Sequence, residues 1–461
     1  MSGSCNHCND YSRSELLRAA IAEAGQGLPG IEPGMPLPAG TGLSRRTFVA
    51  RSAGMLLAVY GASKLPLQAF EEGIANAAIA APNSPVLVTV FLSGGVDALS
   101  QMFPAGDPLY AQYRPTLKLD PKTATAFTED ARLFWHPSLA PIAQLYAEGK
   151  VSVMPSVGYN HPDQSHFTSR HYWEVGAVDP NQMTGWMGRF LDVAGTPDNP
   201  LQGLALDNRL SPALASLNVP VAAIDATDTY TFDTAGVNDT VARRVLESLG
   251  SLAIPSNGEP ALAQASTAVR RSAELRAQLA SFNTSGTFAV PASYPKISGP
   301  FPKRLAGLAA MIGAGLPLKC VALTAPGGYD THSGQAGTLA PGLKQTADTL
   351  FAFQRDLEQR GVADRVLTLV WTEFGRRAKE NGSAGTDHGA AGVGYLIGTR
   401  ATGKMIGEYA GLQSGVDQQG NLVPTSDFRG VYASILEQWF GQDASQVIPD
   451  AKSFARVKVV R

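Results

Sequence analysis

The chain has 461 residues, of which 44% are hydrophobic and 16% are charged, a composition that is ordinary for a globular protein. Its 37 Lys and Arg nearly balance 39 Asp and Glu, so neither a nucleic acid nor an anionic membrane surface has electrostatic support as a partner. With three cysteines in the whole chain, the fold must be stabilised by its core rather than by a disulfide framework.

Residues 1–43 are predicted to form an N-terminal tail. They contain a CxxC motif that encloses a histidine, Cys5-Asn6-His7-Cys8. Structural zinc sites usually have four such ligands, and the remaining cysteine, Cys320, lies in an apolar run. A leader segment that is lost on export is therefore the simpler interpretation, with a metal-binding tail as the alternative.

Residues 44–80 have the parts of an export signal. Arg45 and Arg46 precede a short apolar run over residues 53–62, and small residues follow where a signal peptidase would cut, Ala75-Asn76-Ala77 and Ala78-Ile79-Ala80. Paired arginines mark the twin-arginine variant of such a signal. An amphipathic helix with a chance arginine pair is the alternative.

This signal predicts a protein that the twin-arginine translocase exports already folded, to the periplasm, the cell surface or the exterior. The mature chain is expected to begin near Ala81. The apolar run is far shorter than the roughly 20 residues of a transmembrane helix, so no integral membrane span is expected in the mature chain.

The first strand of the mature chain is predicted at Val86–Leu92, where nearly every residue is apolar or β-branched. Such a run is typical of a strand that is buried on both faces of a parallel sheet. It leads into a Gly-Gly turn that carries Asp97. Because ligands bind beyond the carboxyl ends of strands in open α/β sheets, Asp97 is either a site residue or a turn-capping aspartate.

A second strand is predicted at Lys150–Met154, followed by a loop and then by a helix that runs from about Asp163 through Trp173. Ser165 would lie in the first turn of this helix. Backbone N–H groups and the helix dipole favour anions and an activated nucleophile at that position. The alternative is that Ser165 or Asp163 is a helix N-cap.

Two further strands are predicted at 320–324 and 366–371, joined by a crossover helix over 343–360. Each strand leads into a loop with polar side chains. The third strand is followed by Asp330 and His332; the fourth is followed by Glu373, Arg376, Arg377, Asp387 and His388. The middle of the segment 199–299, residues 238–282, has helical spacing, so that segment is expected to be a helical insertion in a single domain over 81–461.

The strand-end loops collect the residue types that bind metals. Of the seven histidines, four lie in these loops, beside four carboxylates: His161, His166, His332 and His388, with Asp97, Asp330, Glu373 and Asp387. Carboxylates with imidazoles form the ligand set of Zn, Mn or Fe, whereas carboxylates alone favour Mg or Ca. The sequence therefore predicts a metal site at this edge of the sheet.

The order of these motifs resembles the DUF1501 family, twin-arginine-exported bacterial proteins related to the alkaline phosphatase and sulfatase superfamily. The motifs that carry the resemblance are Leu-Ser-Gly-Gly-Val-Asp (92–97), Ser-His-Phe (165–167), Gly-Gly-Tyr-Asp-Thr-His (327–332), Thr-Glu-Phe-Gly-Arg (372–376) and Asp-His-Gly (387–389). The resemblance covers essentially the whole mature chain. It implies an alkaline-phosphatase-like α/β fold, with a mostly parallel central sheet and helices on both faces.

The resemblance also implies roles for individual residues. Asp97 matches a metal-binding aspartate after the first strand, and Asp330 and His332 match ligands of one ion. Ser165 matches the nucleophile, with His166 as a second catalytic residue. One or two divalent ions, Zn, Mn, Mg or Ca, are implied as cofactors.

The superfamily also has an Asp-His pair after a later strand, and two registers are possible for it. In one register the pair is Asp387-His388. In the other, which we prefer because it follows the strand 366–371, Glu373 takes the aspartate position and His388 is a final histidine. Phe374 then stands where a histidine ligand belongs, so one ligand of a second metal would be lost.

The implied activity is hydrolysis of a small anionic phosphate or sulfate ester. The ions would polarise the ester and hold a serine alkoxide or a hydroxide. Arg376 or Arg377 would contact the anionic substrate, or else lie solvated on a loop. The alternative function is a non-catalytic exported binding protein that keeps a degraded site.

Overall fold

The computed structural model describes residues 84–196, 199, 201–207, 209–224, 292–296 and 299–461, together with the backbone of a short strand at Val59–Tyr60. The predicted tail, nearly all of the predicted signal and the helices expected over 238–282 lie outside the described residues. The expectations for those segments stay predictions.

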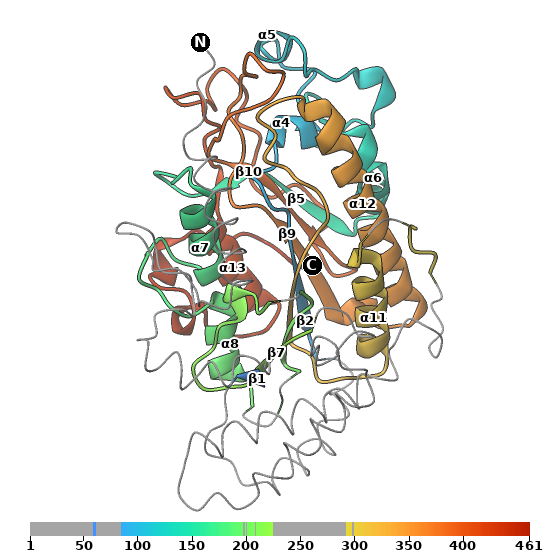
Figure 1. Cartoon of the computed structure of the whole chain (residues 1–461), viewed down its shortest axis with the longest axis vertical. Coiled ribbons are helices and arrows are strands. Elements are labelled where there is room, and N and C mark those ends of the chain that lie inside the picture. Colours follow the sequence, from blue (N-terminus) through green and yellow to red (C-terminus); the bar gives the residue numbers. More distant parts are fainter. Residues whose placement is uncertain are drawn as a thin grey trace, which may run out of the picture.

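The described residues form a mixed α/β fold around a nine-stranded sheet with the order β1-β7-β6-β8-β2-β9-β10-β5-β11 (Figure 1). Seven of these strands run in one direction, and β1 and β10 run in the other. The strands are β1 (Val59–Tyr60), β2 (Val86–Phe91), β5 (Val151–Gly158), β6 (Gly203–Ala205), β7 (Val221–Ala223), β8 (Cys320–Thr324), β9 (Val366–Trp371), β10 (Gly392–Ile397) and β11 (Ser426–Asp427). A separate hairpin pairs β3 (Met102–Phe103) with β4 (Phe134–Trp135).

Helices cover both faces of the sheet, as the sequence predicted. In Figure 1, α6, α11 and α12 lie on one side and α7, α8 and α13 on the other. The helices are α4 (Ala98–Gln101), α5 (Tyr110–Tyr113), α6 (Ala140–Ala147), α7 (His166–Val175), α8 (Trp186–Ala194), α11 (Phe301–Gly313), α12 (Gln335–Gln359) and α13 (Phe428–Gln438). None of the helices in the described ranges combines the length and the apolar character of a membrane span.

The central strand β2 shows why the sheet is buried on both faces. All six of its residues are buried. Val86, Val88 and Val90 belong to one core cluster, and Leu87 and Phe91 belong to the other. Successive side chains of a strand point to opposite faces, so a run without polar alternation has to be covered twice.

Two segments differ from the sequence prediction. The second strand continues to Gly158 because Pro155 and Ser156 lie at a register shift opposite β10, and a bulge accommodates a proline that has no N–H to donate. Residues 203–223, the first part of the expected insertion, instead supply β6 and β7 and extend the sheet.

A Gly-Gly turn lets three loops meet at one edge of the sheet. Gly94 and Gly95 both have positive φ, 117° and 66°. A Cβ on Gly94 would lie 2.4 Å from the backbone nitrogen of Asp330, and one on Gly95 would lie 2.3 Å from the ring of Phe374. Only glycine fits this close approach, which brings the loops after β2, β8 and β9 into contact.

Candidate metal centre

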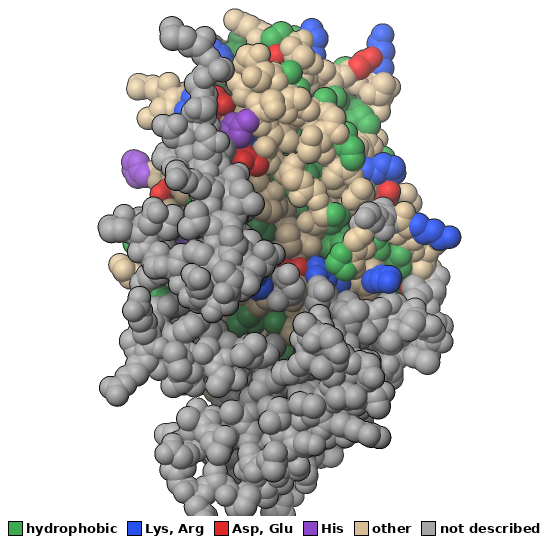
Figure 2. Space-filling model, viewed as in Figure 1, with side chains coloured by type: hydrophobic (Ala, Val, Ile, Leu, Met, Phe, Trp, Pro, Cys, Tyr) green, Lys and Arg blue, Asp and Glu red, His purple; other side chains and the backbone are tan. Residues whose placement is uncertain are grey.

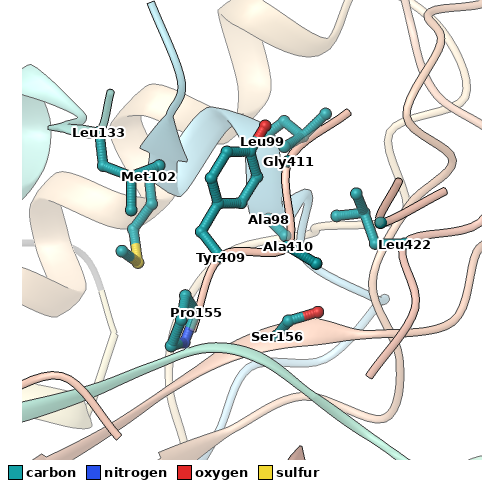
Figure 3. Close-up of a pocket in the computed structure, with 11 residues that line it drawn as sticks. Ala98, Leu99, Met102, Leu133, Pro155, Ser156, Tyr409, Ala410, Gly411 and Leu422 are labelled. Atoms are coloured by element: carbon teal, nitrogen blue, oxygen red, sulfur yellow. The ribbon is translucent and has the colours of Figure 1, made fainter. Parts of the chain in front are cut away.

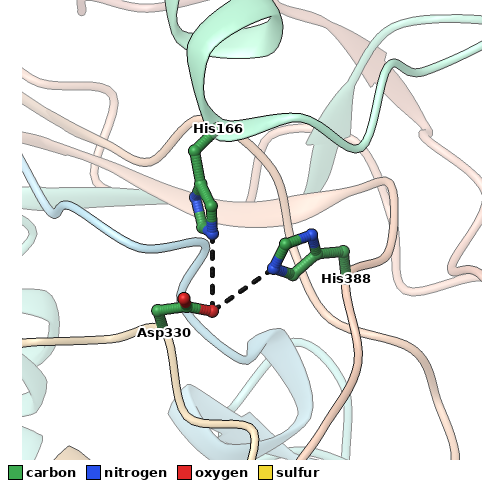
Figure 4. A group of neighbouring side chains, drawn as sticks. All are labelled: His166, Asp330 and His388. Carbon is green, nitrogen blue, oxygen red and sulfur yellow. Dashed lines mark hydrogen bonds and ion pairs between the residues drawn. The ribbon is translucent and has the colours of Figure 1, made fainter. Parts of the chain in front are cut away.

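Three imidazoles and one carboxylate converge at this edge. The Nε2 atoms of His166, His332 and His388 lie 3.4, 3.0 and 3.3 Å from Oδ1 of Asp330. Figure 4 shows the two longer contacts. The Nε2 atoms of His332 and His388 are 3.0 Å apart. Ligand atoms around a tetrahedral zinc are about 3.3 Å from one another at the usual bond lengths, and His166, Asp330 and His388 form a group close enough to hold one ion. His332 lies beside this group, in contact with Asp330 and His388. We call these four residues the histidine cluster.

Different parts of the fold supply the members of the histidine cluster. His166 is the first residue of α7, and Asp330 and His332 lie between β8 and α12. His388 forms an antiparallel bridge with Arg376, just before β10. The ligand atoms of His166, Asp330 and His388 all lie within 4.8 Å of one another. The cluster therefore forms only when the loops after β5, β8 and β9 are in place.

The far side of each ring is held by an oxygen. Nδ1 of His388 donates to the carbonyl of Gln164 at 2.8 Å, and Nδ1 of His166 is 2.7 Å from Oε1 of Glu373. The third ring, His332, has its Nδ1 3.5 Å from Oδ1 of Asp387. A proton on Nδ1 leaves the Nε2 lone pair directed into the cluster, which is the usual arrangement of metal-binding histidines.

Glu373 orients His166 from outside the cluster. Its side chain is buried, and Oε1 also accepts the N–H of Gly94 at 2.9 Å. Burial would raise the pKa of Glu373, but the hydrogen bond and charge of His166 hold that pKa below its ordinary value. The resemblance implied a metal ligand at this position, and the structure gives Glu373 a contact with a ring that faces the cluster.

Phe374 is buried against the cluster. Its ring centroid lies 4.7 Å from that of His166 and 4.9 Å from that of His388. Phe374 is 1% exposed, and His388, against which it packs, faces Asp330 and His332. One wall of the cluster is therefore an aromatic ring that offers an ion no ligand atom.

Arg376 is the main internal cation of the cluster. It is fully buried, and Nη2 is 2.6 Å from Oδ1 of Asp330 while Nη1 is 3.3 Å from Nε2 of His332. The same guanidinium donates to the backbone carbonyls of Gly94, Gly95, Tyr329 and Thr386. The sequence suggested a substrate contact, whereas the structure commits these donors to loops and ligands.

The charges of the cluster shift its pKa values. Burial would raise the pKa of Asp330, but hydrogen bonds from His166, His332 and His388 and the charge of Arg376 hold it well below its usual range. Burial would lower the pKa of His166, yet Asp330 and Glu373 raise it to about 9. Without an ion, the imidazole between two carboxylates is thus protonated at neutral pH.

Asp97 lies outside the histidine cluster in a polar network of its own. Arg114 grips it at 2.6 and 2.8 Å, and Ser100 and Gln335 each donate to Oδ2 at 2.6 Å. Both Asp97 and Arg114 are almost completely buried. The resemblance implied that Asp97 binds a metal. In the structure its carboxylate is instead paired with the guanidinium of Arg114.

Ser165 occupies the N-cap position of α7, and its side chain makes no capping hydrogen bond. Asp163 forms a local turn just before the helix, because its Oδ1 accepts the N–H of Ser165 at 2.7 Å. The seryl side chain is thus next to His166 and is not used by the helix. Its role as nucleophile stays a prediction, as does a substrate contact by the partly exposed Arg377.

Sequence reasoning missed three residues that shape this region. Gln164 anchors His388 through a backbone carbonyl, which no side-chain pattern reveals. Arg114 follows a four-residue helix with no periodicity to place it. Gln335 joins Asp97 to the hydroxyls of Thr331 and Thr386. One of the three could have been anticipated: a buried charge needs a counter-charge, so a buried Asp97 implies a basic partner, which the structure shows to be Arg114.

Elsewhere the described surface offers no competing site of similar chemistry. The small pocket in Figure 3 is mostly apolar and contains none of the histidine cluster. Its lining comes from four segments: Ala98, Leu99 and Met102; Leu133; Pro155 and Ser156; and Tyr409, Ala410, Gly411, Gly415 and Leu422. On the face in Figure 2, described basic and acidic side chains are interspersed, in keeping with the balanced composition.

A family model described as "Protein of unknown function (DUF1501)" matches residues 158–428. No curated protein matches the chain. Among solved structures, the lipoteichoic acid synthase LtaP from Listeria monocytogenes is similar with a TM-score of 0.32 and 8% identity, over 87% of this chain and 79% of that one. A protein in the alkaline phosphatase superfamily from Vibrio parahaemolyticus has a TM-score of 0.31 and 9% identity, over 83% and 79%.

Proposed function

The chain belongs to the DUF1501 family, and from that premise we propose that it is an exported metal-dependent hydrolase of phosphate or sulfate esters. The observation that carries the proposal is the convergence of three Nε2 atoms on Oδ1 of Asp330. Such a donor set with anchored rings binds a divalent ion well.

The residues fit a transition metal better than a hard cation. His166, His332 and His388 offer imidazole nitrogens, and Asp330 offers the single carboxylate. Mg and Ca prefer several oxygen ligands, whereas Zn and Mn accept this mixture. We therefore favour Zn or Mn, and one ion, at the histidine cluster.

An ion held there would act as a Lewis acid on an ester oxygen. The protein residues would supply the rest. Ser165, beside His166 at the start of α7, is the proposed nucleophile, and the helix N-terminus favours its ionised form. Glu373 and Arg376 keep His166 and Asp330 oriented. Export by the twin-arginine route, proposed from Arg45 and Arg46, would deliver the protein with its ion already bound.

Metal analysis and turnover test the proposal together. Protein purified without chelator is expected to hold metal and to hydrolyse p-nitrophenyl phosphate or p-nitrophenyl sulfate. H388A should lose the ion and the activity, whereas H161A, an exposed histidine outside the cluster, should keep both. Metal-free wild-type protein without turnover would contradict the proposal.

The second candidate is a non-catalytic exported binding protein. The Asp97–Arg114 pair favours it, because a carboxylate that the template uses for metal is neutralised here by a side chain. Two results together would support this alternative: the wild-type protein binds metal but hydrolyses neither ester, and the Ser165→Ala variant binds metal as the wild type does.

A further inference from the structure

We infer that the site holds one divalent ion and prefers esters with a single negative charge, such as phosphodiesters and sulfate monoesters, over doubly charged phosphate monoesters. This inference rests on the proposed function and names its substrate class. Three features of the structure carry it: the pairing of Asp97, the commitment of Arg376 and the acidic rim of the cluster.

The first feature removes a second cation site. An ionised carboxylate offers about four lone-pair positions. Four donors already lie on Asp97: two from Arg114, one from Ser100 and one from Gln335. A second ion at Asp97 would have to displace a guanidinium that is 1% exposed, which would leave a buried charge without its partner. Arg114 therefore supplies the counter-charge that a second ion would otherwise supply.

The second feature is the arginine nearest the histidine cluster. Arg376 is fully buried, and its guanidinium donates to four backbone carbonyls and to Asp330. Its positive charge is thus balanced by Asp330. A doubly charged substrate would need further hydrogen-bond donors, and those of Arg376 are already bonded to protein oxygens.

The third feature is the rim. Asp387 is half exposed, with its Oδ1 3.5 Å from Nδ1 of His332. Among the side chains that contact the histidine cluster, Arg376 and one bound divalent ion would bring three positive charges, and Asp330, Glu373 and Asp387 bring three negative ones. A site near neutrality leaves a second negative charge on the substrate uncompensated, and the half-exposed Asp387 repels that charge.

The test compares substrates that differ in charge at pH 8. Zn-loaded protein is expected to contain one ion per chain. It should show a higher kcat/KM for p-nitrophenyl methyl phosphate and p-nitrophenyl sulfate than for p-nitrophenyl phosphate. A second readout is binding: in Co(II)-loaded protein, the visible spectrum should respond to dimethyl phosphate at concentrations no higher than those needed for methyl phosphate.

A charge variant sharpens the test. Asp387→Asn removes one negative charge from the rim, so it should raise the relative kcat/KM and affinity for the doubly charged ligands by roughly threefold or more. Asp364→Asn is the matched control: Asp364 is exposed, just before β9, at the end of the sheet away from the cluster. It should leave the ratios unchanged.

Two outcomes would overturn the inference: two tightly bound ions per chain, or a wild-type preference for the doubly charged ligands in both readouts. If no ester is hydrolysed, the proposed function fails, and the metal content with the order of anion affinities still decides the inference. If esters are hydrolysed with the monoester preferred, the proposed function stands and the inference fails.

Discussion

His166 and Glu373 are joined by a 2.7 Å contact between Nδ1 and Oε1, and Glu373 is in turn held by the N–H of Gly94. A buried carboxylate thereby fixes the ring of a proposed metal ligand from behind. Outer partners of this kind set the orientation and basicity of the imidazole that they contact.

Substituting that carboxylate should weaken metal binding without removing a ligand. Glu373→Ala is expected to lower the affinity for Zn by about 10- to 100-fold, and Glu373→Gln by less, because the amide can still accept the Nδ1 proton. Competition with a chromophoric chelator measures the effect. Glu437→Gln, which changes a surface ion pair with Arg456, is the control. Equal affinity in E373A and the control would contradict this role.

Replacing Arg376 should destabilise the metal-free protein more than the loaded one. Arg376→Gln removes the guanidinium from Asp330 and leaves protonated His166 as the nearby cation, at a cost of about 2–4 kcal/mol given that the carboxylate is one-third exposed. Zn should then increase the free energy of unfolding more in the variant than in the wild type, because the ion supplies the missing positive charge. Urea unfolding with and without Zn checks this, with Arg377→Gln as the control. A loss that Zn does not reduce would count against it.

The ring of Phe374 should be structural. Phe374→Ala should destabilise the protein by about 3–5 kcal/mol because it empties a buried site between Gly95 and two imidazoles, and Phe374→Leu should cost less. Phe374→His should not raise ester hydrolysis, since Asp97 is held by Arg114 and offers a second ion no carboxylate. Denaturant unfolding and p-nitrophenyl phosphate assays test both statements. Increased hydrolysis by F374H would revive a two-ion site.

His136 should make stability fall in mild acid. Burial lowers the pKa of His136 to about 4, against the opposing charge of Asp97, and its Nδ1 accepts the N–H of Ser138. Between the unfolded value near 6.5 and about 4, the unfolded chain binds the extra proton, so stability declines as pH falls through that window. The loss from this residue is at most about 3 kcal/mol, and it is absent above pH 6.5.

Unfolding by urea at pH 4.5 and pH 7.5 measures this dependence. His136→Asn keeps a capping acceptor and should flatten it. His161→Asn, at an exposed position, should not change it. An unchanged pH dependence in H136N would show that other groups cause the acid sensitivity.

Export should depend on the arginine pair. Lys at both Arg45 and Arg46 should leave uncleaved precursor in the cytoplasm, because the translocation machinery reads the pair as an address. Cell fractionation and N-terminal sequencing of the processed product, expected to start near Ala81, check the prediction. Normal export of this variant would exclude the twin-arginine route.

The regular elements were predictable because their signals are local. The runs at 86–92, 320–324 and 366–371 are unbroken and apolar, and the helix between the last two carries the required crossover. These signals placed Asp330, His332 and His388 at strand ends, and the structure brings them together.

The partners of those residues depend on tertiary contacts that no local pattern encodes. Glu373 and Asp97 both follow predicted strands, yet one contacts an imidazole and the other a guanidinium. Arg376 follows a predicted strand and looks like a loop arginine in the sequence. In the structure it is buried, because the carbonyls of the Gly94-Gly95 turn accept hydrogen bonds from its guanidinium. The sequence could therefore predict which types of residue form the site and roughly where they lie in the fold. It could not predict the contacts that decide the role of each residue.

The order of strands in the sheet constrains when the chain can fold. The two neighbours of β2 are β8 and β9, so that Thr89 contacts Val321 across 232 positions and Val96 contacts Thr372 across 276. Contacts of such high sequence separation form slowly. At roughly 5–20 residues per second, a ribosome needs on the order of ten seconds or more after β2 emerges before its partners exist. During this interval β2 is an apolar strand without a sheet, so we expect the nascent chain to need a chaperone until its last third is made.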